Sequence, residues 1–410
     1  MDKFNLILTI AIIIGLFSTY FLIIQKPLYV DEQAHFWTIS NFCRFDYTIP
    51  DFLTTIPGYH FFGGFFGYLT SCTESAIRFF SLLVSFASVF VFYSICKQLN
   101  MKYKKEKSLQ FLFLPILFPF FFLIYTDVLS VLFVLSMFYF LLREDYILSG
   151  TFGLLSFIVR QNNIIWIIFC LVYILIDLKD KKTFLEKIRE IFSKRFLIKA
   201  YPYLAVLLIA FIFIIKNGGV VLGDKEKHPD LFFGPMNIYT FLFFFFWINL
   251  PENILNFKKI GSWFKRVEKK ELGMIILLSL IFFTFFLMTF KIDHAYNDYG
   301  IYNYFLRNKI LHFFNGSIIL QSVFFLCILY SIFSLYRTKF AEKRHYLIYI
   351  FSIIFLGMSW LIENRYFLIP YIMINLFALR EAKTEKTLAV WYLFGTIAYM
   401  YLFYTGWTFW

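Results

Sequence analysis

Hydrophobic residues occur in long runs that are separated by short charged clusters along the whole chain. A run of about 20 apolar residues crosses a bilayer core of roughly 30 Å, and somewhat shorter runs can be buried among neighbouring helices. The pattern predicts an all-α polytopic membrane protein that forms one domain over residues 1–410. About thirteen spans are expected, near residues 5–24, 76–95, 109–125, 128–142, 147–159, 164–176, 200–215, 237–250, 273–290, 316–335, 346–361, 366–379 and 388–405.

The first run follows Asp2 and Lys3, is too long for the apolar part of a secretory signal and lacks a small-residue cleavage site. We expect it to be retained as the first membrane-spanning helix. Composition agrees with this fold class, because 60% of the 410 residues are hydrophobic and 61 are Phe. A soluble globular protein is excluded on these grounds.

Lysine and arginine gather in alternate loops, which sets the orientation because cytoplasmic loops carry an excess of these residues. With the N-terminus inside, the cytoplasmic loops are 96–108, 143–146, 177–199, 251–272, 336–345 and 380–387. The net charge of +13 is then an orientation signal. We expect no nucleic-acid partner.

The middles of the predicted spans contain no Asp, Glu, Lys or Arg. Ion-coupled transporters need ionisable groups inside the membrane, so a transporter is disfavoured. The polar residues gather instead in outer loops, as expected for an enzyme that works at a membrane surface on a lipid-borne substrate. These outer segments are 25–75, 216–236 and 291–315, with short connections at 160–163 and 362–365.

Asp31, Glu32 and His35 follow the first span by a few residues. If a short helix starts here, Asp31 and His35 lie one turn apart on the same face. A carboxylate in that place is able to accept the proton of a sugar hydroxyl as a general base. The alternative is that Asp31 simply caps the helix.

Two arginines stand at the outer ends of spans, Arg160 beside Gln161 and Arg365 beside Glu363. Guanidinium groups suit bidentate phosphate recognition, so either arginine is a candidate ligand of a lipid phosphate. The alternatives are that they snorkel toward lipid headgroups, or that Glu363 and Arg365 form a surface pair.

The loop 293–298 combines carboxylates, an imidazole and an aromatic ring, a mixture that fits carbohydrate better than lipid, and its alternative is an ordinary polar loop anchored by tyrosines. The loop 223–230 resembles a solvated turn by composition. The candidate sugar-binding residues in and beside these loops are Asp224, Lys225, His228, His294, Asp298 and Tyr302.

Cysteine spacing and phosphate-binding motifs give no sign of a metal or a nucleotide. The five Cys show no paired C-x-x-C spacing, and there is no P-loop, dinucleotide-binding fingerprint or D-x-D run. We expect no metal and no cofactor. Cys43 and Cys72 fall in or beside the first outer loop, where they either form a disulfide in an oxidising lumen or remain two unpaired thiols.

Five segments, taken in order, resemble the dolichyl-phosphate-glucose α-1,2-glucosyltransferase family. They resemble the family patterns M-D-E-x-x-H, T-T-x-P-G-L-Y, R-Q-T-N-I-I-W, G-I-V-x-G-D-[RK]-x-x-H and E-x-R-Y-F-x-x-P-Y. The matching stretches are Tyr29–His35, Thr54–Tyr59, Arg160–Trp166, Gly219–His228 and Glu363–Tyr371. The loop 291–309 departs from the family pattern, because it is shorter and lacks an Arg-His pair.

The resemblance implies a GT-C type bundle in the membrane of the endoplasmic reticulum, with its active site in the lumen. The implied donor is dolichyl β-D-glucosyl phosphate, and the implied acceptor is a lipid-linked oligosaccharide that carries two glucoses. A β donor and an α product imply an inverting, metal-independent displacement. Asp31 would be the base, with Glu32 and His35 orienting it or the sugar, and Arg160 with Gln161 and Arg365 would hold the donor phosphate.

The remaining candidates Asp224, Lys225, His228, His294, Asp298, Tyr302 and Glu363 would hold the glycans, and membrane lipid would surround the bundle. Two other functions stay open at this point. One is another luminal transferase that uses a dolichol-phosphate sugar. The other is a lipid flippase or a non-catalytic channel regulator.

Overall fold

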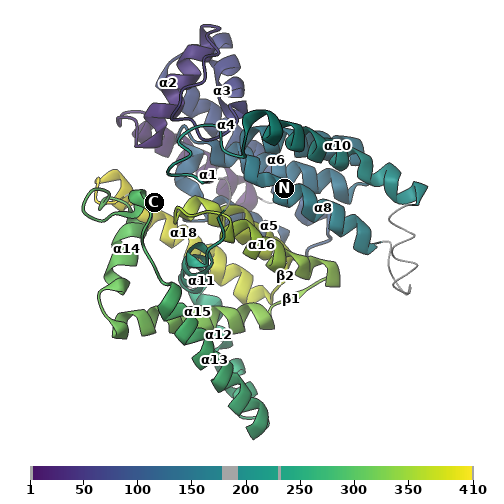
Figure 1. The fold of residues 1–410 in the computed structure, drawn as a ribbon, viewed down its shortest axis with the longest axis vertical. Coiled ribbons are helices and arrows are strands. Elements are labelled where there is room, and N and C mark those ends of the chain that lie inside the picture. Colours follow the sequence, from purple (N-terminus) through teal and green to yellow (C-terminus); the bar gives the residue numbers. More distant parts are fainter. Residues whose placement is uncertain (1–2, 178–192, 230–231, 409–410) are drawn as a thin grey trace. The chain divides into compact units, whose positions relative to one another are not determined.

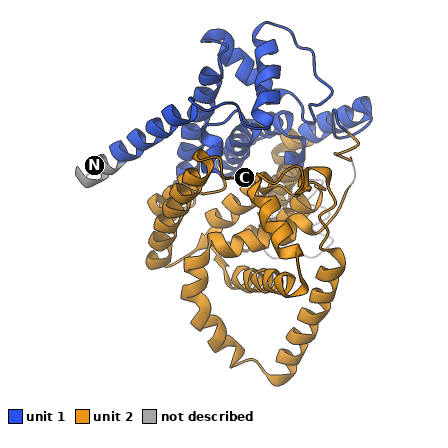
Figure 2. Cartoon of the chain, turned by 90° about the vertical axis from the view of Figure 1, so that its left-hand side faces the viewer, with its two compact units in different colours: residues 1–95, 117–164, 205–224 blue, residues 96–116, 165–204, 225–410 orange. Residues whose placement is uncertain are grey.

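The computed structural model describes residues 3–177, 193–229 and 232–408 and consists almost entirely of helices (Figure 1). Most of the basic run predicted for the loop 177–199 lies outside these residues, as do two positions of the predicted outer loop 216–236. The described chain divides into two compact units, shown in blue and orange in Figure 2. Unit 1 comprises residues 1–95, 117–164 and 205–224, and unit 2 comprises residues 96–116, 165–204 and 225–410.

Unit 1 carries the segment 25–75, which was predicted as the first outer loop, between two long apolar helices. Within it α6 packs against α7, α2 against α3, and α3 against α7. Its elements are α1 (Lys3–Ile23), α2 (Asp31–Cys43), α3 (Gly58–Leu69), α4 (Glu74–Gln98), the 3-10 turn η1 (Phe118–Phe121), α6 (Thr126–Leu142), α7 (Tyr146–Val159) and η2 (Gln161–Asn163).

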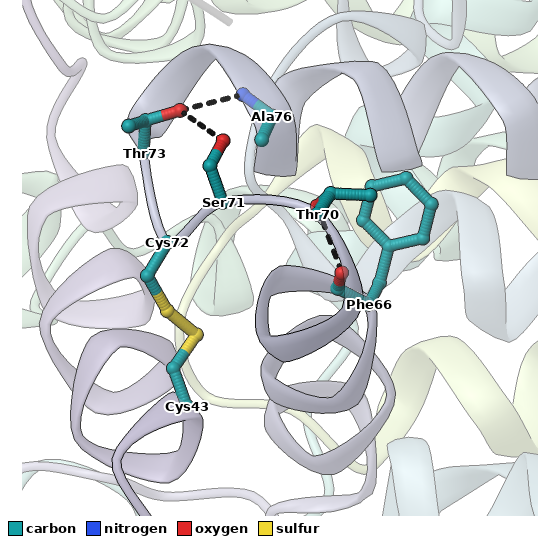
Figure 3. The surroundings of a disulfide bond; sticks show 7 residues. All are labelled: Cys43, Phe66, Thr70, Ser71, Cys72, Thr73 and Ala76. Carbon is teal, nitrogen blue, oxygen red and sulfur yellow. Dashed lines mark hydrogen bonds between the residues drawn. A yellow bond between two sulfur atoms is a disulfide. The ribbon is translucent and has the colours of Figure 1, made fainter.

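Glycines on α3 let α2 approach it closely. A β-carbon at Gly64 would lie 2.8 Å from Cβ of Phe42, and one at Gly67 would lie 2.6 Å from Sγ of Cys43. Because real β-carbons do not approach other atoms so closely, only glycine fits these two positions. Cys43 at the end of α2 is joined by a disulfide to Cys72 in the turn before α4 (Figure 3). The sequence did not decide whether these two cysteines pair, and in the structure they do.

Unit 2 contains the remaining helices and one two-stranded ribbon. In it α11 packs against α15, and α18 packs against α5 and α12. The elements are α5 (Lys104–Leu112), α8 (Ile164–Asp177), α11 (Met236–Ile248), α12 (Leu250–Phe264), α13 (Lys269–Thr289), η3 (Ala295–Asn297), α14 (Leu306–Asn315), α15 (Ile318–Arg337), β1 (Lys339–Phe340), η4 (Lys343–Tyr346), α16 (Leu347–Gly357), η5 (Asn364–Phe367), α17 (Leu368–Phe377), β2 (Ala378–Leu379) and α18 (Ala382–Tyr404). One further helix, α10 (Lys194–Asn217), has residues in both units.

A buried cation fixes one end of unit 2. Lys107 on α5 donates to the backbone oxygens of Asn375 at 2.7 Å and Ala378 at 2.8 Å, and it pairs with Glu385 on α18 at 3.1 Å. Gln110, one turn further along α5, donates to the same carboxylate at 2.6 Å. These contacts tie α5 to the end of α17 and the start of α18.

Five helices of the described chain, α4, α10, α13, α15 and α18, are long and apolar enough to cross a membrane. The pair α11 and α12, bent by 89° at its break, makes a sixth span if it is counted as one. The chain is thus a multi-pass helical membrane protein, but the expected count of about thirteen spans is not confirmed. One difference has a clear cause. The run 109–125 forms no single helix, because Pro115 and Pro119 follow the end of α5 at Leu112.

Candidate functional site

Asp31 is the first residue of α2, so the predicted helix starts where expected and carries Asp31 and His35 one turn apart. The capping position belongs to Val30, which makes no side-chain cap and adopts a φ of 43°. The interpretation of Asp31 as the helix cap is therefore wrong. A positive φ is costly for a β-branched residue, so the backbone just before Asp31 is held in place by its surroundings.

Glu32 helps to fix this backbone, because its carboxylate is fully buried and accepts several hydrogen bonds. It accepts from Nε and Nη2 of Arg78 at 3.0 and 2.7 Å, from the backbone N–H of Ile124 at 2.8 Å and from that of Tyr29 at 2.9 Å. Glu32 was grouped with the catalytic residues and expected to orient Asp31 or the sugar. These contacts support the first of these two roles, the positioning of its neighbour Asp31.

His35 meets a second histidine from α3. Its Nδ1 lies 3.0 Å from Nε2 of His60, and its ring also makes edge contacts with Tyr59 and Tyr125. His60 is fully buried, and burial, followed by the nearby His35, holds the pKa of His60 well below its usual value. Burial therefore favours the neutral form of the His60 ring.

Arg160 forms an ion pair with the buried carboxylate of Asp127 at the start of α6. The Arg160 side chain is 13% exposed, so anions in solution reach only a small part of it. Its neighbour Gln161 is buried and donates its amide N–H groups to the backbone oxygens of Thr54 at 3.0 Å and Val220 at 3.2 Å. Gln161, predicted as a phosphate ligand, thus ties two chain segments together.

The segment that contains Asp224 runs beside the one before α3. The N–H groups of Leu222, Gly223 and Asp224 donate to the oxygens of Thr54, Leu53 and Asp51 at 3.3, 3.1 and 3.1 Å. Within unit 1, four of the five segments that carried the family resemblance therefore touch one another or their common neighbours: 29–35, 54–59, 160–163 and 219–224. Widely spaced parts of the sequence form one polar cluster, which we call the Asp31 cluster.

A second group, the Glu363 cluster, lies in unit 2. The buried carboxylate of Glu363 accepts from Nη1 of Arg307 at 2.9 Å and from Nη2 of Arg365 at 3.3 Å. Glu363 and Arg365 do pair, although not as an exposed surface pair, since their side chains are 3% and 13% exposed. The backbone N–H of Glu363 donates to the side chain of Asn237, which fixes this turn against α11.

Two segments of unit 2 that were predicted to lie in outer loops, 225–229 and 291–315, meet through His294. Its Nε2 lies 2.9 Å from the backbone oxygen of Lys227, its ring packs edge-on against Trp360, and His228 lies beside it at 5.8 Å between ring centres. Lys227 donates to the hydroxyl of Tyr296 at 3.2 Å. The predicted sugar-binding residues His228 and His294 are thus neighbours within a patch of aromatic rings.

The other predicted sugar ligands of unit 2 lie around this patch. Asp298 is exposed and accepts from the backbone N–H of Gly300 at 2.7 Å. The ring of Tyr302 packs against Tyr296 at 5.6 Å, and Lys225 is exposed. Exposed polar groups beside aromatic rings are common in carbohydrate sites, so the arrangement is compatible with the predicted role.

The sequence did not single out His60, or three charged residues at these clusters: Arg78, Asp127 and Arg307. Each stands at or near the end of a helix. Their position at the border of an apolar run is the sequence feature that could have identified the charged residues as candidates. Over residues 3–177, 193–229 and 232–408, no three His, Cys, Asp or Glu side chains come close enough together to hold a metal ion.

The fold and its two clusters define a multi-pass helical membrane protein whose acids, arginines and histidines gather in the segments between apolar helices. The chain belongs to the DIE2/ALG10 family, whose model matches residues 25–376.

Several curated relatives carry the name Dol-P-Glc:Glc(2)Man(9)GlcNAc(2)-PP-Dol alpha-1,2-glucosyltransferase. The protein of that name from Rattus norvegicus is 24% identical over 88% of this chain and 86% of its own length. The one from Drosophila melanogaster is 24% identical over 93% and 91%, and the one from Candida albicans is 25% identical over 85% and 84%. No solved structure matches the chain.

Proposed function

We propose that this protein transfers a glucose from dolichyl phosphate glucose to the lipid-linked oligosaccharide that already carries two glucoses, forming an α-1,2 linkage. The observation that carries the proposal is the match of the family model to residues 25–376. Eight curated relatives also match this chain. The Asp31 cluster supports it, because the segments that resemble the family are also the ones that contact each other in unit 1.

The proposed step is a single displacement with inversion. The 2-hydroxyl oxygen of the acceptor glucose attacks the anomeric carbon of the donor, and the bond between that carbon and the phosphate oxygen breaks. Asp31 takes the hydroxyl proton, and dolichyl phosphate leaves as the anion. Phosphate is a good leaving group, so this step needs neutralisation of charge more than a second proton donor.

Arg160 and Arg365 are proposed to stabilise the leaving phosphate. Each is 13% exposed and is held by a buried carboxylate, Asp127 for Arg160 and Glu363 for Arg365. A preorganised donor at developing charge contributes about 2.7–4 kcal/mol in other enzymes. Glu32 and Gln161 act by positioning, whereas Asp224, Lys225, His228, His294, Asp298, Tyr302 and Glu363 are proposed to line the glycan sites.

We further infer a GT-C type bundle in the endoplasmic reticulum membrane, with the loop 25–75 in the lumen. The disulfide between Cys43 and Cys72 supports this side, because disulfides persist in oxidising compartments. The shorter apolar helices, Thr9–Ile23, Thr126–Leu142, Tyr146–Val159 and Gln161–Ile176, would supply further spans.

An assay with purified protein tests the substrate. We expect transfer from dolichyl phosphoglucose to the diglucosylated acceptor and none from dolichyl phosphomannose. Transfer of mannose alone would replace this proposal with another dolichol-dependent transferase. No transfer of either sugar would favour a flippase or a regulatory membrane protein.

Asp31→Asn tests the base. We expect this variant to insert and fold as the native protein does, and to transfer glucose at least ~10²-fold more slowly, within the usual range for loss of general-base catalysis. Asp51→Asn, which changes an exposed carboxylate of the same loop, is the matched control. Native turnover in Asp31→Asn would remove Asp31 from the proposed role.

A further inference from the structure

His60 has no place in the chemistry proposed above, yet it is a fully buried titratable group in contact with the Asp31 cluster. Its Nε2 faces Nδ1 of His35 at 3.0 Å. Its own Nδ1 is buried and has no hydrogen-bond partner among the described residues. The two facts together restrict where the protons of this pair reside.

Only one proton can occupy the short contact between the two rings. If His35 donates, His60 must carry its proton on Nδ1, and a buried N–H is left without an acceptor. If His60 donates from Nε2, its Nδ1 presents only a lone pair, and no N–H is orphaned. Buried donors without partners are rarer in proteins than under-satisfied acceptors, so the second arrangement is favoured.

A doubly protonated His60 is disfavoured for a separate reason. It would place a charge in a fully buried position whose only polar neighbour across the contact is another imidazole. The direction of the pKa shift of His60 agrees with the neutral form.

We propose that His60 is a positioning residue that donates from Nε2 to Nδ1 of His35 and thereby fixes His35 as the Nε2–H tautomer. In this form His35 cannot accept a proton at Nδ1, and its Nε2 carries a hydrogen-bond donor. His35 then acts on the sugar or phosphate beside Asp31 as a donor, which leaves Asp31 as the base. This inference rests on the proposed glucosyl transfer.

The groups around the pair are consistent with a fixed neutral imidazole. Tyr59 on α3 and Tyr125 before α6 contact the His35 ring. Glu32 and Asp127 affect Tyr59 electrostatically, but each is paired with an arginine, Arg78 and Arg160 respectively. Asp31 lies one turn away on the same helix as His35. Both buried acids are therefore compensated, and neither needs a histidinium partner.

The test uses amide side chains that copy one ring nitrogen at a time, in the full-length protein. Gln places an N–H near the position of Nε2, and Asn places one near the position of Nδ1. We expect His60→Gln to keep kcat within about threefold, whereas His60→Met loses ~10- to 100-fold in kcat with little change in KM, since misplacement of a reacting-site group has costs of this order. At position 35, His35→Gln should retain more activity than His35→Asn.

The pH profile gives a readout that a purely structural role would not move. In His60→Met no hydrogen bond from residue 60 fixes the tautomer of His35. An inflection near the ordinary histidine pKa of about 6.5 should therefore appear in the pH profile of kcat, and it should be absent from that of the native enzyme. Thermal unfolding of each variant in detergent separates loss of the lock from loss of the fold.

The outcomes separate the two proposals. Equal kcat and pH profiles in native protein and His60→Met, or His35→Asn more active than His35→Gln, would overturn the tautomer lock while glucosyl transfer stands. Absence of glucosyl transfer in the native protein would overturn the proposed function and this inference with it.

Discussion

Glu32 and Arg78 form an ion pair that water does not reach, with side chains 0% and 1% exposed. Arg78 also donates to the backbone oxygens of Ile23, Lys26 and Pro27 at 2.9, 2.9 and 3.1 Å. One guanidinium thus holds the end of α1, the segment before α2 and the second residue of α2. Asp31 is positioned by contacts that its neighbours make.

We expect Arg78→Met to lower the free energy of unfolding by about 3–5 kcal/mol, because it leaves the buried carboxylate of Glu32 without its cation. Thermal unfolding in detergent measures this as a lower melting temperature. Arg44→Met, at an exposed position in the same loop, is the control and should change little. An equal melting temperature for Arg78→Met and Arg44→Met would show that the pair contributes no net stability.

The neighbours Asp31 and Glu32 show how far the role of a single residue can be predicted from the sequence. Both acids were expected in the catalytic group from their sequence context. Nothing local distinguishes them, because the partner that buries Glu32 stands 46 positions away along the chain. His60 is a similar case, since its importance lies in a contact with a residue 25 positions earlier.

At the level of elements, the hairpin of α2 and α3 depends on the absence of side chains along one face of α3. Gly63, Gly64 and Gly67 all face α2. Gly64 is the sharpest case, because a β-carbon there would meet the Cβ and the backbone of Phe42, which cannot rotate away. The hairpin carries Asp31 and His35 on one helix and His60 on the other, so its packing sets the geometry of the candidate site.

We expect Gly64→Ala to separate α2 from α3, to lower the melting temperature and to reduce glucosyl transfer, since overpacking typically costs about 1–3 kcal/mol. The matched control is Gly273→Ala on α13, where a β-carbon would meet nothing within 4 Å. Alanine there should be neutral or slightly stabilising because of its higher helix propensity. Stability and activity that are unchanged in Gly64→Ala would contradict the close packing.

Helices were predicted correctly where an apolar run was long and uninterrupted, and wrongly where proline interrupts such a run. The start of α2 at Asp31 was expected from the residues themselves. The run 109–125 looked like a span because hydropathy counts Pro115 and Pro119 as minor interruptions, whereas a helix loses backbone bonds at each of them. The 89° break between α11 and α12 also has a proline beside it, Pro251, the second residue of α12.

At the level of the whole molecule, the orientation in the membrane stays a prediction drawn from the positive loops. Single cysteines at two exposed positions test it, in a background where the three free native cysteines are buried. With intact microsomes and a membrane-impermeant maleimide, Lys265→Cys should be labelled at once. Asp51→Cys should be labelled only after the membrane is permeabilised.

If Asp51→Cys were labelled in sealed vesicles while Lys265→Cys was protected, the orientation would be the opposite of the predicted one. The Asp31 cluster would then lie on the cytoplasmic side. Comparable labelling of both positions before and after permeabilisation would show that they share the outer face of the microsomes. Either result would conflict with a luminal reaction, while leaving the family membership untouched.

If the loop 25–75 faces the lumen, as proposed, the bond between Cys43 and Cys72 forms only in molecules that insert in this orientation. Glutathione keeps thiols reduced on the cytosolic side, so a chain inserted upside down would leave this pair open. The loop that the bond closes spans 29 positions, and closing a loop of that size is worth about 3–4 kcal/mol in the chain-entropy account. A misoriented molecule would therefore be both inactive and easier to unfold, which makes it a ready target for degradation.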